Sequence, residues 1–143
     1  MIKIQRNNGF TLMELMIIVV IIAILAAIAV PSFQEFQKKN RLEEARAKLM
    51  YNHQFMMTFY AQHYTFKKNS TTWPDLPITK TDFFDIAFTS KAKGEKPNQF
   101  RLRATPNADY QSRENRYIEI DHSGNIKLCT PKKNVKSATC IAY

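Results

Sequence analysis

Apolar and polar positions divide the first part of the chain into two consecutive helical patterns. No polar residue occurs from Leu15 to Val30, and a single carboxylate, Glu14, lies just before this run. After Pro31, the segment 33–63 contains no glycine or proline, and its apolar residues recur at spacings of three, four and seven: Leu42, Ala45, Leu49, Met56 and Phe59. This recurrence is typical of an amphipathic helix that buries one stripe. We therefore predict one long helix from Phe10 to about His63, kinked or loosened at Pro31.

Beyond the helix, the chain shows the alternation of apolar and polar residues that is typical of half-buried strands. The segment from Thr65 to Thr81 is polar, contains two prolines and predicts a surface loop. Strands are predicted at 84–89, 100–104, 116–120 and 125–129, with a hairpin turn at 121–124. The pattern predicts an α+β fold, in which a four-stranded antiparallel sheet packs on the second half of the helix. A tail loop from Thr130 to Thr139 would close the domain.

A short basic leader precedes the apolar run and ends in a small residue. An ordinary secretory signal is cut after its apolar region, next to small residues. Here the small residue, Gly9, comes before that region, so cleavage after it would keep the apolar segment and leave Phe10 as the new N-terminus. A charged side chain in a membrane span costs about 2.5–3.5 kcal/mol. Glu14 therefore indicates a function that provides the carboxylate with a partner.

Together, the leader, Gly9, Phe10, Glu14 and the apolar run resemble the class III signal of type IV pilins. A plain membrane anchor would explain the apolar run but neither the glycine nor the glutamate. The resemblance implies that a prepilin peptidase removes residues 1–9 and methylates Phe10. Residues 10–40 would form a helix that spans the inner membrane and later the filament core, and residues 41–143 would form the globular pilin domain. Glu14 would pair with the Phe10 amine of a neighbouring pilin, in a helical filament displayed at the cell surface.

The two cysteines, Cys129 and Cys140, lie close together near the C-terminus. In an extracytoplasmic protein such a pair predicts a disulfide, and no histidine or further cysteine stands nearby at metal-ligand spacing. The bridge would stabilise the domain by about 3 kcal/mol. In type IV pilins a disulfide ties the last segment to the sheet, whereas secretion pseudopilins generally lack it, so the pair favours a true pilin.

The formal charge of +9, which falls to +7 without the leader's Lys3 and Arg6, predicts an anionic partner such as nucleic acid, lipid headgroups or acidic polysaccharide. Three scattered histidines form no nucleophile–base arrangement, and there is no glycine-rich phosphate loop. The sequence thus predicts a structural or binding protein, with no catalysis, cofactor, metal or small-molecule substrate.

Basic residues gather in three segments that we expect to share one face. They are the first loop (Lys67, Lys68, Lys80), the turn between the first two strands (Lys91, Lys93, Lys96) with Arg101 and Arg103 on the next strand, and the disulfide loop (Lys132, Lys133, Lys136). Such a cluster predicts salt-dependent binding of DNA phosphates. Ser70, Thr71 and Thr72 would add polar contacts to bases or phosphates. Trp73 is either a stacking contact for DNA or a core residue that fixes the loop.

The segment from Phe55 to Ile78 also resembles the minor pilins that serve as DNA receptors in competence. The resemblance rests on Phe59-Tyr60, Phe66-Lys67, Ser70-Thr71, Trp73-Pro74 and Leu76-Pro77. It implies binding of extracellular double-stranded DNA, with preference for a short uptake sequence, through the three basic segments. An alternative is a minor pilin of adhesion or signalling, which the later segment Ala104 to Asn107 resembles. An ordinary structural pilin is a third possibility.

Overall fold

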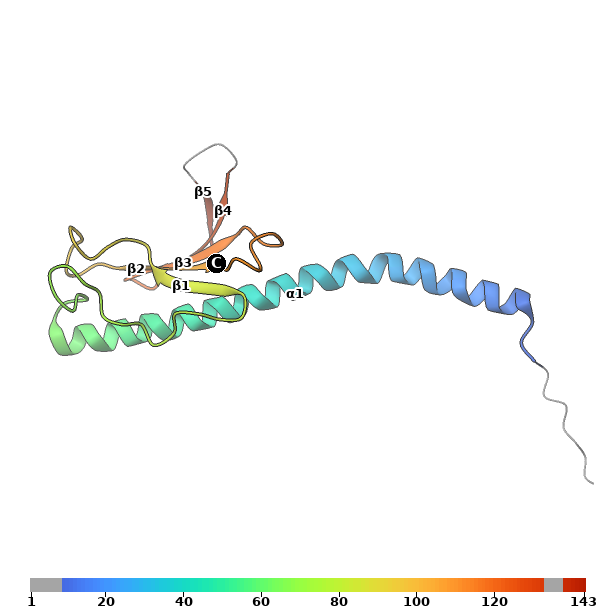
Figure 1. Cartoon of the computed structure of the whole chain (residues 1–143), viewed down its shortest axis with the longest axis horizontal. Coiled ribbons are helices and arrows are strands. Elements are labelled where there is room, and N and C mark those ends of the chain that lie inside the picture. The colour runs from blue at the N-terminus through green and yellow to red at the C-terminus, as the bar shows by residue number, and fades with distance from the viewer. Residues whose placement is uncertain (1–8, 133–137) are drawn as a thin grey trace, which may run out of the picture. The chain divides into compact units, whose positions relative to one another are not determined.

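A computed structural model describes residues 9–132 and 138–143, which form one helix and five strands (Figure 1). The elements are α1 (Leu12–His63), β1 (Phe84–Phe88), β2 (Arg101–Pro106), β3 (Tyr117–Asp121), β4 (Ile126–Pro131) and β5 (Ala138–Ala142). The chain divides into two compact units, one ending at Gln37 and the other running from Lys38 to Tyr143. The boundary falls within α1, so each unit contains part of this helix.

In the first unit, α1 begins at Leu12, two residues after the predicted start. Thr11 caps the helix, since its hydroxyl accepts a hydrogen bond from the Glu14 amide at 3.2 Å. The helix continues through Pro31 without interruption. Its most apolar window has a mean hydropathy of 3.0 and contains no buried residue, and the helix is long and apolar enough to cross a membrane.

The second unit has a hydrophobic core of its own. Leu42, Ala45, Leu49 and Met56 are buried, which confirms the predicted stripe, whereas Phe59 is only half-buried and stacks on His63. The stripe packs with the inward-facing residues of the sheet, which are Phe84, Ile86, Leu102, Ala104, Ile118, Ile120 and Leu128. Every buried side chain in the described part of the chain lies between Leu42 and Cys129. We therefore expect the unit Lys38–Tyr143 to fold on its own.

The sheet is an antiparallel meander in which the strands lie in the order β1-β2-β3-β4-β5. The predicted count of four strands was one short, and much of the predicted tail loop is strand. β4 extends to Pro131, and β5 pairs with it in a register that places Cys140 opposite Cys129. A disulfide joins these two residues, as predicted. Figure 1 shows the β4–β5 hairpin projecting from the sheet, away from the part of α1 that the sheet covers.

Pattern analysis missed β5 because its residues are largely exposed and uncharged. Without a buried face, a strand has no need for the apolar–polar alternation on which strand prediction depends. Its stability comes instead from backbone pairing with β4 and from the disulfide.

Candidate nucleic-acid interface

The first loop, between α1 and β1, is fixed to α1 at both of its ends. The helix ends where Tyr64 adopts a left-handed conformation, with φ of 55°, and its amide donates a hydrogen bond to the Tyr60 carbonyl at 2.7 Å. Near the other end of the loop, the buried Asn52 donates from Nδ2 to the Ile78 carbonyl at 2.6 Å. Its Oδ1 accepts from the Ile78 amide at 3.1 Å. The loop therefore leaves and rejoins the helix at defined points.

Hydrogen bonds also join this loop to the connection between β1 and β2. The Phe66 amide and the Thr65 hydroxyl both donate to the Pro97 carbonyl, at 2.8 and 3.2 Å. The Lys67 ammonium donates to the backbone carbonyl of Glu95. These contacts turn two segments that are far apart in sequence into one surface, which we call the loop face and define as residues 65–75 and 89–99.

Trp73 provides a third link across the loop face. Its ring stacks on that of Phe88, with centroids 4.7 Å apart and an interplanar angle of 10°. The indole N–H donates to the Ser90 carbonyl at 2.8 Å, and the side chain is half-buried. Because one ring face and the only polar atom are already in use, this geometry favours the residue that fixes the loop over the stacking contact for DNA.

The polar turn at the tip of the first loop directs many of its groups inward. Asn69 Oδ1 accepts hydrogen bonds from the Thr71 amide, the Thr71 hydroxyl and the Thr72 amide, at 2.9, 3.0 and 2.9 Å. The Lys68 amide donates to the Thr72 carbonyl at 3.0 Å. Ser70 is exposed at the tip. The turn is thus a compact structure whose amides at Thr71 and Thr72 are bonded internally, whereas the Ser70 and Thr72 hydroxyls have no hydrogen bond with any described residue.

The loop face carries an excess of positive charge. Five lysines oppose two carboxylates, Asp75 and Glu95, which leaves a formal charge of +3: the lysines are Lys67, Lys68, Lys91, Lys93 and Lys96. Lys68 approaches Asp75 at 3.2 Å, but both side chains are largely exposed, so this pair is weak in water and under salt. A ligand with several phosphates would meet lysines from both segments at once.

The two arginines of β2 lie on the outer face of the sheet and differ in their partners. Arg103 contacts the Glu119 carboxylate through Nε at 2.8 Å and Nη2 at 2.6 Å, and its guanidinium lies 4.4 Å from the Tyr117 ring centroid. Its charge is therefore balanced within the sheet. Arg101 is exposed and forms no ion pair or hydrogen bond through its side chain with any described residue.

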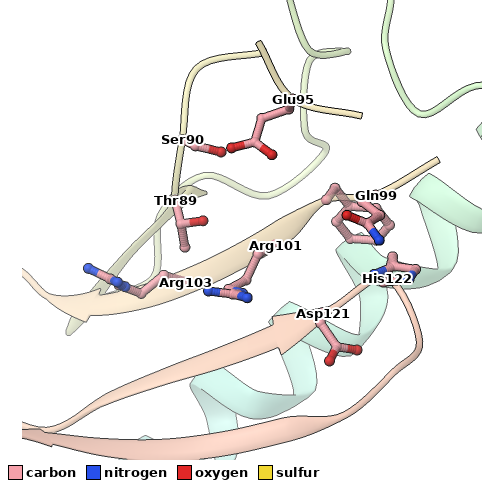
Figure 2. A pocket seen from close by; sticks show the side chains of 9 residues that line it. Thr89, Ser90, Glu95, Gln99, Arg101, Arg103, Asp121 and His122 are labelled. Carbon is pink, nitrogen blue, oxygen red and sulfur yellow. The ribbon is translucent and has the colours of Figure 1, made fainter. Parts of the chain in front are cut away.

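Arg101 faces a polar cavity of about 460 Å³ between the loop face and the outer face of the sheet (Figure 2). It is lined by Thr89, Ser90, Glu95, Gln99, Phe100, Arg101, Arg103, Asp121 and His122. Sequence analysis did not single out Thr89, Ser90, Glu95, Gln99, Asp121 or His122 as site residues. Thr89, Ser90, Glu95 and Gln99 are near the lysine-rich turn in the sequence, but Asp121 and His122 lie in and after β3 and have no such signal, because the β2–β3 pairing brings them to Arg101.

Two further basic residues that the structure describes, Lys80 and Lys132, lie apart from this surface. The backbone of Lys80 forms an isolated antiparallel β-bridge with that of Asp85 in β1. The β1–β2 connection leaves the sheet at one end, whereas β4 runs toward the opposite end, so Lys132, which follows β4, lies far from the loop face. Lys133 and Lys136 lie outside the described residues. The structure thus brings the lysines at 67–68 and 91–96 together on the loop face, whereas Lys132, the described member of the third segment, lies at the other end of the strands.

At the start of the chain, Gly9 and Phe10 precede the helix, and Phe10 is 72% exposed. Glu14 lies in the first turn of α1 and is also exposed. Within the described ranges, no group of three His, Cys, Asp or Glu side chains is placed to hold a metal ion.

A long apolar helix, an antiparallel sheet and a disulfide near the C-terminus are the components of a type IV pilin. The prokaryotic N-terminal methylation motif matches residues 4–30. The family described as type IV minor pilin ComP, DNA uptake sequence receptor, matches residues 31–125, and the chain belongs to this family. The family and the fold are those of structural pilins.

Solved structures that resemble the chain include two minor pilins. The solution structure of the minor DNA-uptake pilin ComP from Neisseria subflava is 29% identical, with a TM-score of 0.57, and the match covers 72% of this chain and 95% of that one. The non-core minor pilin PilV from Neisseria meningitidis is 23% identical, with a TM-score of 0.56, over 69% of this chain and 93% of that one, and supports the fold alone. Among curated proteins, no sequence matches the chain significantly.

Proposed function

We propose that this minor pilin is a receptor for extracellular double-stranded DNA, displayed on a type IV pilus during natural transformation, with preference for a DNA uptake sequence. The loop face is the observation that supports this function most strongly. Its lysines come from two segments that the Pro97, Glu95 and Ser90 carbonyls hold together. Clustered lysines bind phosphates and release counterions, which gives strong and salt-dependent affinity.

The N-terminal segment would place this receptor on the filament. In our proposal, prepilin peptidase cuts after Gly9 and methylates Phe10, and the apolar part of α1 holds the processed chain in the inner membrane. On assembly, Glu14 pairs with the Phe10 amine of a neighbouring pilin. A bulkier residue at position 9 should slow leader removal, which a heavier band on a gel would show. Residues 1–9, 10–40 and 41–143 are then the leader, the membrane and filament-core helix, and the globular domain.

DNA binding can be tested with the unit Lys38–Tyr143 and duplex DNA across a salt series. We expect the logarithm of the affinity to fall linearly with the logarithm of the salt concentration. Replacing Lys91, Lys93 and Lys96 with alanine should weaken binding to all sequences and reduce the slope by about 0.9 for each phosphate that is no longer neutralised. Lys39→Ala removes one exposed charge from α1, roughly 36 Å along the helix from His63, and should change little.

The same titration addresses the third basic segment. Lys132→Ala should reduce the salt slope only if DNA reaches the end of the strands opposite the loop face. Absence of duplex binding at every salt concentration would contradict the receptor function and leave an adhesion or signalling role for this pilin.

A further inference from the structure

The side chains that line the polar cavity fall into two groups according to whether their hydrogen-bonding atoms are already used. Arg103 is bonded to Glu119. Asp121 accepts from the Ser123 amide at 2.9 Å and from the Asn125 amide and Nδ2 at 3.1 Å each. Burial would raise the pKa of Asp121, but these hydrogen bonds outweigh it and keep the pKa below its usual value. His122 Nε2 lies 3.3 Å from the Ser123 hydroxyl.

In the second group, the hydrogen-bonding atoms of the side chains have no partner among the described residues. Five side chains make no hydrogen bond or ion pair with any residue that the structure describes: Thr89, Ser90, Glu95, Gln99 and Arg101. Figure 2 shows that they come from both sides of the cavity, with Ser90 and Glu95 on the β1–β2 connection and Arg101 on β2. The cavity therefore presents a guanidinium, a carboxamide, a carboxylate and two hydroxyls to a ligand.

This set of groups fits the edges of nucleic-acid bases better than it fits phosphate. A phosphate offers acceptors only and carries negative charge, so the Glu95 carboxylate would repel it. Base edges offer both donors and acceptors: arginine pairs with guanine O6 and N7, glutamine with adenine N6 and N7, and a carboxylate with the cytosine amino group. The β1–β2 connection that contributes Ser90 and Glu95 to the cavity also carries lysines, whose charge is suited to phosphate.

The walls of the cavity are held in position before any ligand binds. Ser90 is fixed through its carbonyl by Trp73, and Glu95 through its carbonyl by Lys67. On the other side, the Thr89 amide donates to the Arg101 carbonyl at 3.0 Å. Groups held in this way lose less conformational freedom on binding, which favours affinity and specificity.

We propose that this cavity is the sequence-recognising part of the DNA interface, where Arg101, assisted by Glu95 and Gln99, contacts base edges while the surrounding lysines contact phosphates. The inference rests on the proposed DNA-receptor function and assigns its specificity to the cavity. The Ser70–Thr72 turn, in which the Thr71 amide, the Thr71 hydroxyl and the Thr72 amide donate inward to Asn69, then supports the loop face and does not select the sequence.

Arg101→Lys is the decisive variant because it keeps the charge and removes the planar pair of donors that guanine requires. The unit Lys38–Tyr143 is incubated with duplexes that carry a randomised central segment, and the bound duplexes are sequenced. Arg101→Lys should lose the preference for guanine at one position by about 5- to 150-fold. Its salt slope should remain unchanged, because lysine keeps the positive charge.

Arg103→Lys is the matched control, since Arg103 lies two residues further along the same face of β2 but is paired with Glu119. It should retain the wild-type base preference. A second variant, Glu95→Ala, removes both a negative charge and the acceptor. It should strengthen binding to duplexes of arbitrary sequence and should lose the preference for a base that donates an amino hydrogen. Circular dichroism confirms that each variant is folded.

The outcomes separate this inference from the proposed function. If the wild-type unit binds no DNA, the receptor function fails and the cavity has no role in it. If the wild type binds DNA without base preference, DNA binding stands, but both the proposed preference for an uptake sequence and the assignment to the cavity are wrong. If Arg101→Lys keeps the full preference, the receptor function stands and only the assignment to the cavity is wrong. Loss of preference in Arg101→Lys but not in Arg103→Lys supports it.

Discussion

Each of the two parts of α1 has one polar residue beside or within an apolar surface. The two residues differ in whether the chain itself supplies their side chains with hydrogen-bond partners. From Leu15 to Val30 the helix is apolar on all sides and has no buried residue. The Glu14 carboxylate makes no hydrogen bond or ion pair with any described residue, and only the Glu14 amide contacts the cap at Thr11. From Lys38 onward one stripe is buried, and Asn52 within it is fully buried with both amide atoms bonded to Ile78. The second part therefore stabilises the domain, whereas the first is built for partners outside the chain.

Glu14→Val should have the largest effect, and only on assembly. The substitution would leave the Phe10 amine of a neighbouring pilin buried without its charge partner, at a cost of about 3–5 kcal/mol. We expect incorporation into filaments to fall more than about a hundredfold. Immunoblots of sheared pili and of membranes measure this, with leader removal unchanged. Glu44→Val, at an exposed position of the domain part, should assemble normally. Wild-type amounts of Glu14→Val in filaments would overturn the proposed pair.

Leu49→Ala should have the converse effect. Leu49 is fully buried in the stripe, and such truncations cost about 2.7–5 kcal/mol of unfolding free energy. Urea unfolding of the full chain in detergent micelles, followed through the fluorescence of Trp73, provides the measurement. Leu25→Ala is the matched control in the apolar part, where the same side chain is 62% exposed, and should leave the domain transition in place. Equal destabilisation by both variants would remove the distinction between the two parts.

Much of this division could be predicted from the sequence, because each part of the helix carries its own periodicity. The spacing of Leu42, Ala45, Leu49 and Met56 matches the buried stripe. The methylation motif matches residues 4–30, the range that contains the glycine and the glutamate. Asn52 was missed although it falls between Leu49 and Met56, since an apolar pattern passes over a polar residue. Its partner, Ile78, lies 26 residues away, and no local pattern encodes that contact.

The candidate site was harder to predict for the same reason. Lysine-rich turns are visible in the sequence, but the bonds that join them involve backbone carbonyls, such as that of Pro97, which have no sequence signal. Whether Trp73 packs inward depends on Phe88, in a different element. The cavity beside Arg101 needs both the folded turn and the register of β2, and so it lies beyond single-sequence reasoning.

Removal of the disulfide tests how much the β4–β5 hairpin contributes to the stability of the domain. Cys129→Ala with Cys140→Ala opens a loop of sequence separation 11 and should lower the unfolding free energy by about 3 kcal/mol. Alanine is preferred at position 129 because the site is fully buried and a serine hydroxyl would be left there without water. Urea unfolding of the full chain in detergent micelles, followed through the fluorescence of Trp73, measures this loss. Because β5 is mostly exposed, we expect DNA binding at the loop face to survive, and its loss would show that the two ends are coupled.

Asn52→Ala should destabilise the domain by about 1–3 kcal/mol, because the amide and carbonyl of the half-buried Ile78 lose their partner. The effect should extend to the loop face, since Asn52 fixes one end of the first loop. Hydrogen exchange of the amides at 65–78 is the measurement, and faster exchange there than in β3 is the expected result. Gln54→Ala, at an exposed position on the same helix, serves as the control. Uniform exchange across the unit would indicate that Asn52 contributes to global stability alone.

The smallest expected effect is on the pH dependence of the stability of the unit Lys38–Tyr143. Burial would raise the pKa of Glu114, but hydrogen bonds from the Arg116 guanidinium and amide outweigh it and hold the pKa below its usual value of 4.5. A carboxyl group with a lowered pKa in the folded state contributes stability that is present above pH 4.5 and lost as the pH falls through the folded-state pKa.

Glu114→Gln should therefore lose less stability than the wild type between pH 7 and pH 3. The difference should be no more than about 1 kcal/mol, because the Arg116 side chain is 31% exposed. Urea midpoints of the unit Lys38–Tyr143 at several pH values measure it. The exposed Glu44→Gln should follow the wild-type curve, and a wild-type curve for Glu114→Gln would show that the pair with Arg116 contributes nothing to acid sensitivity.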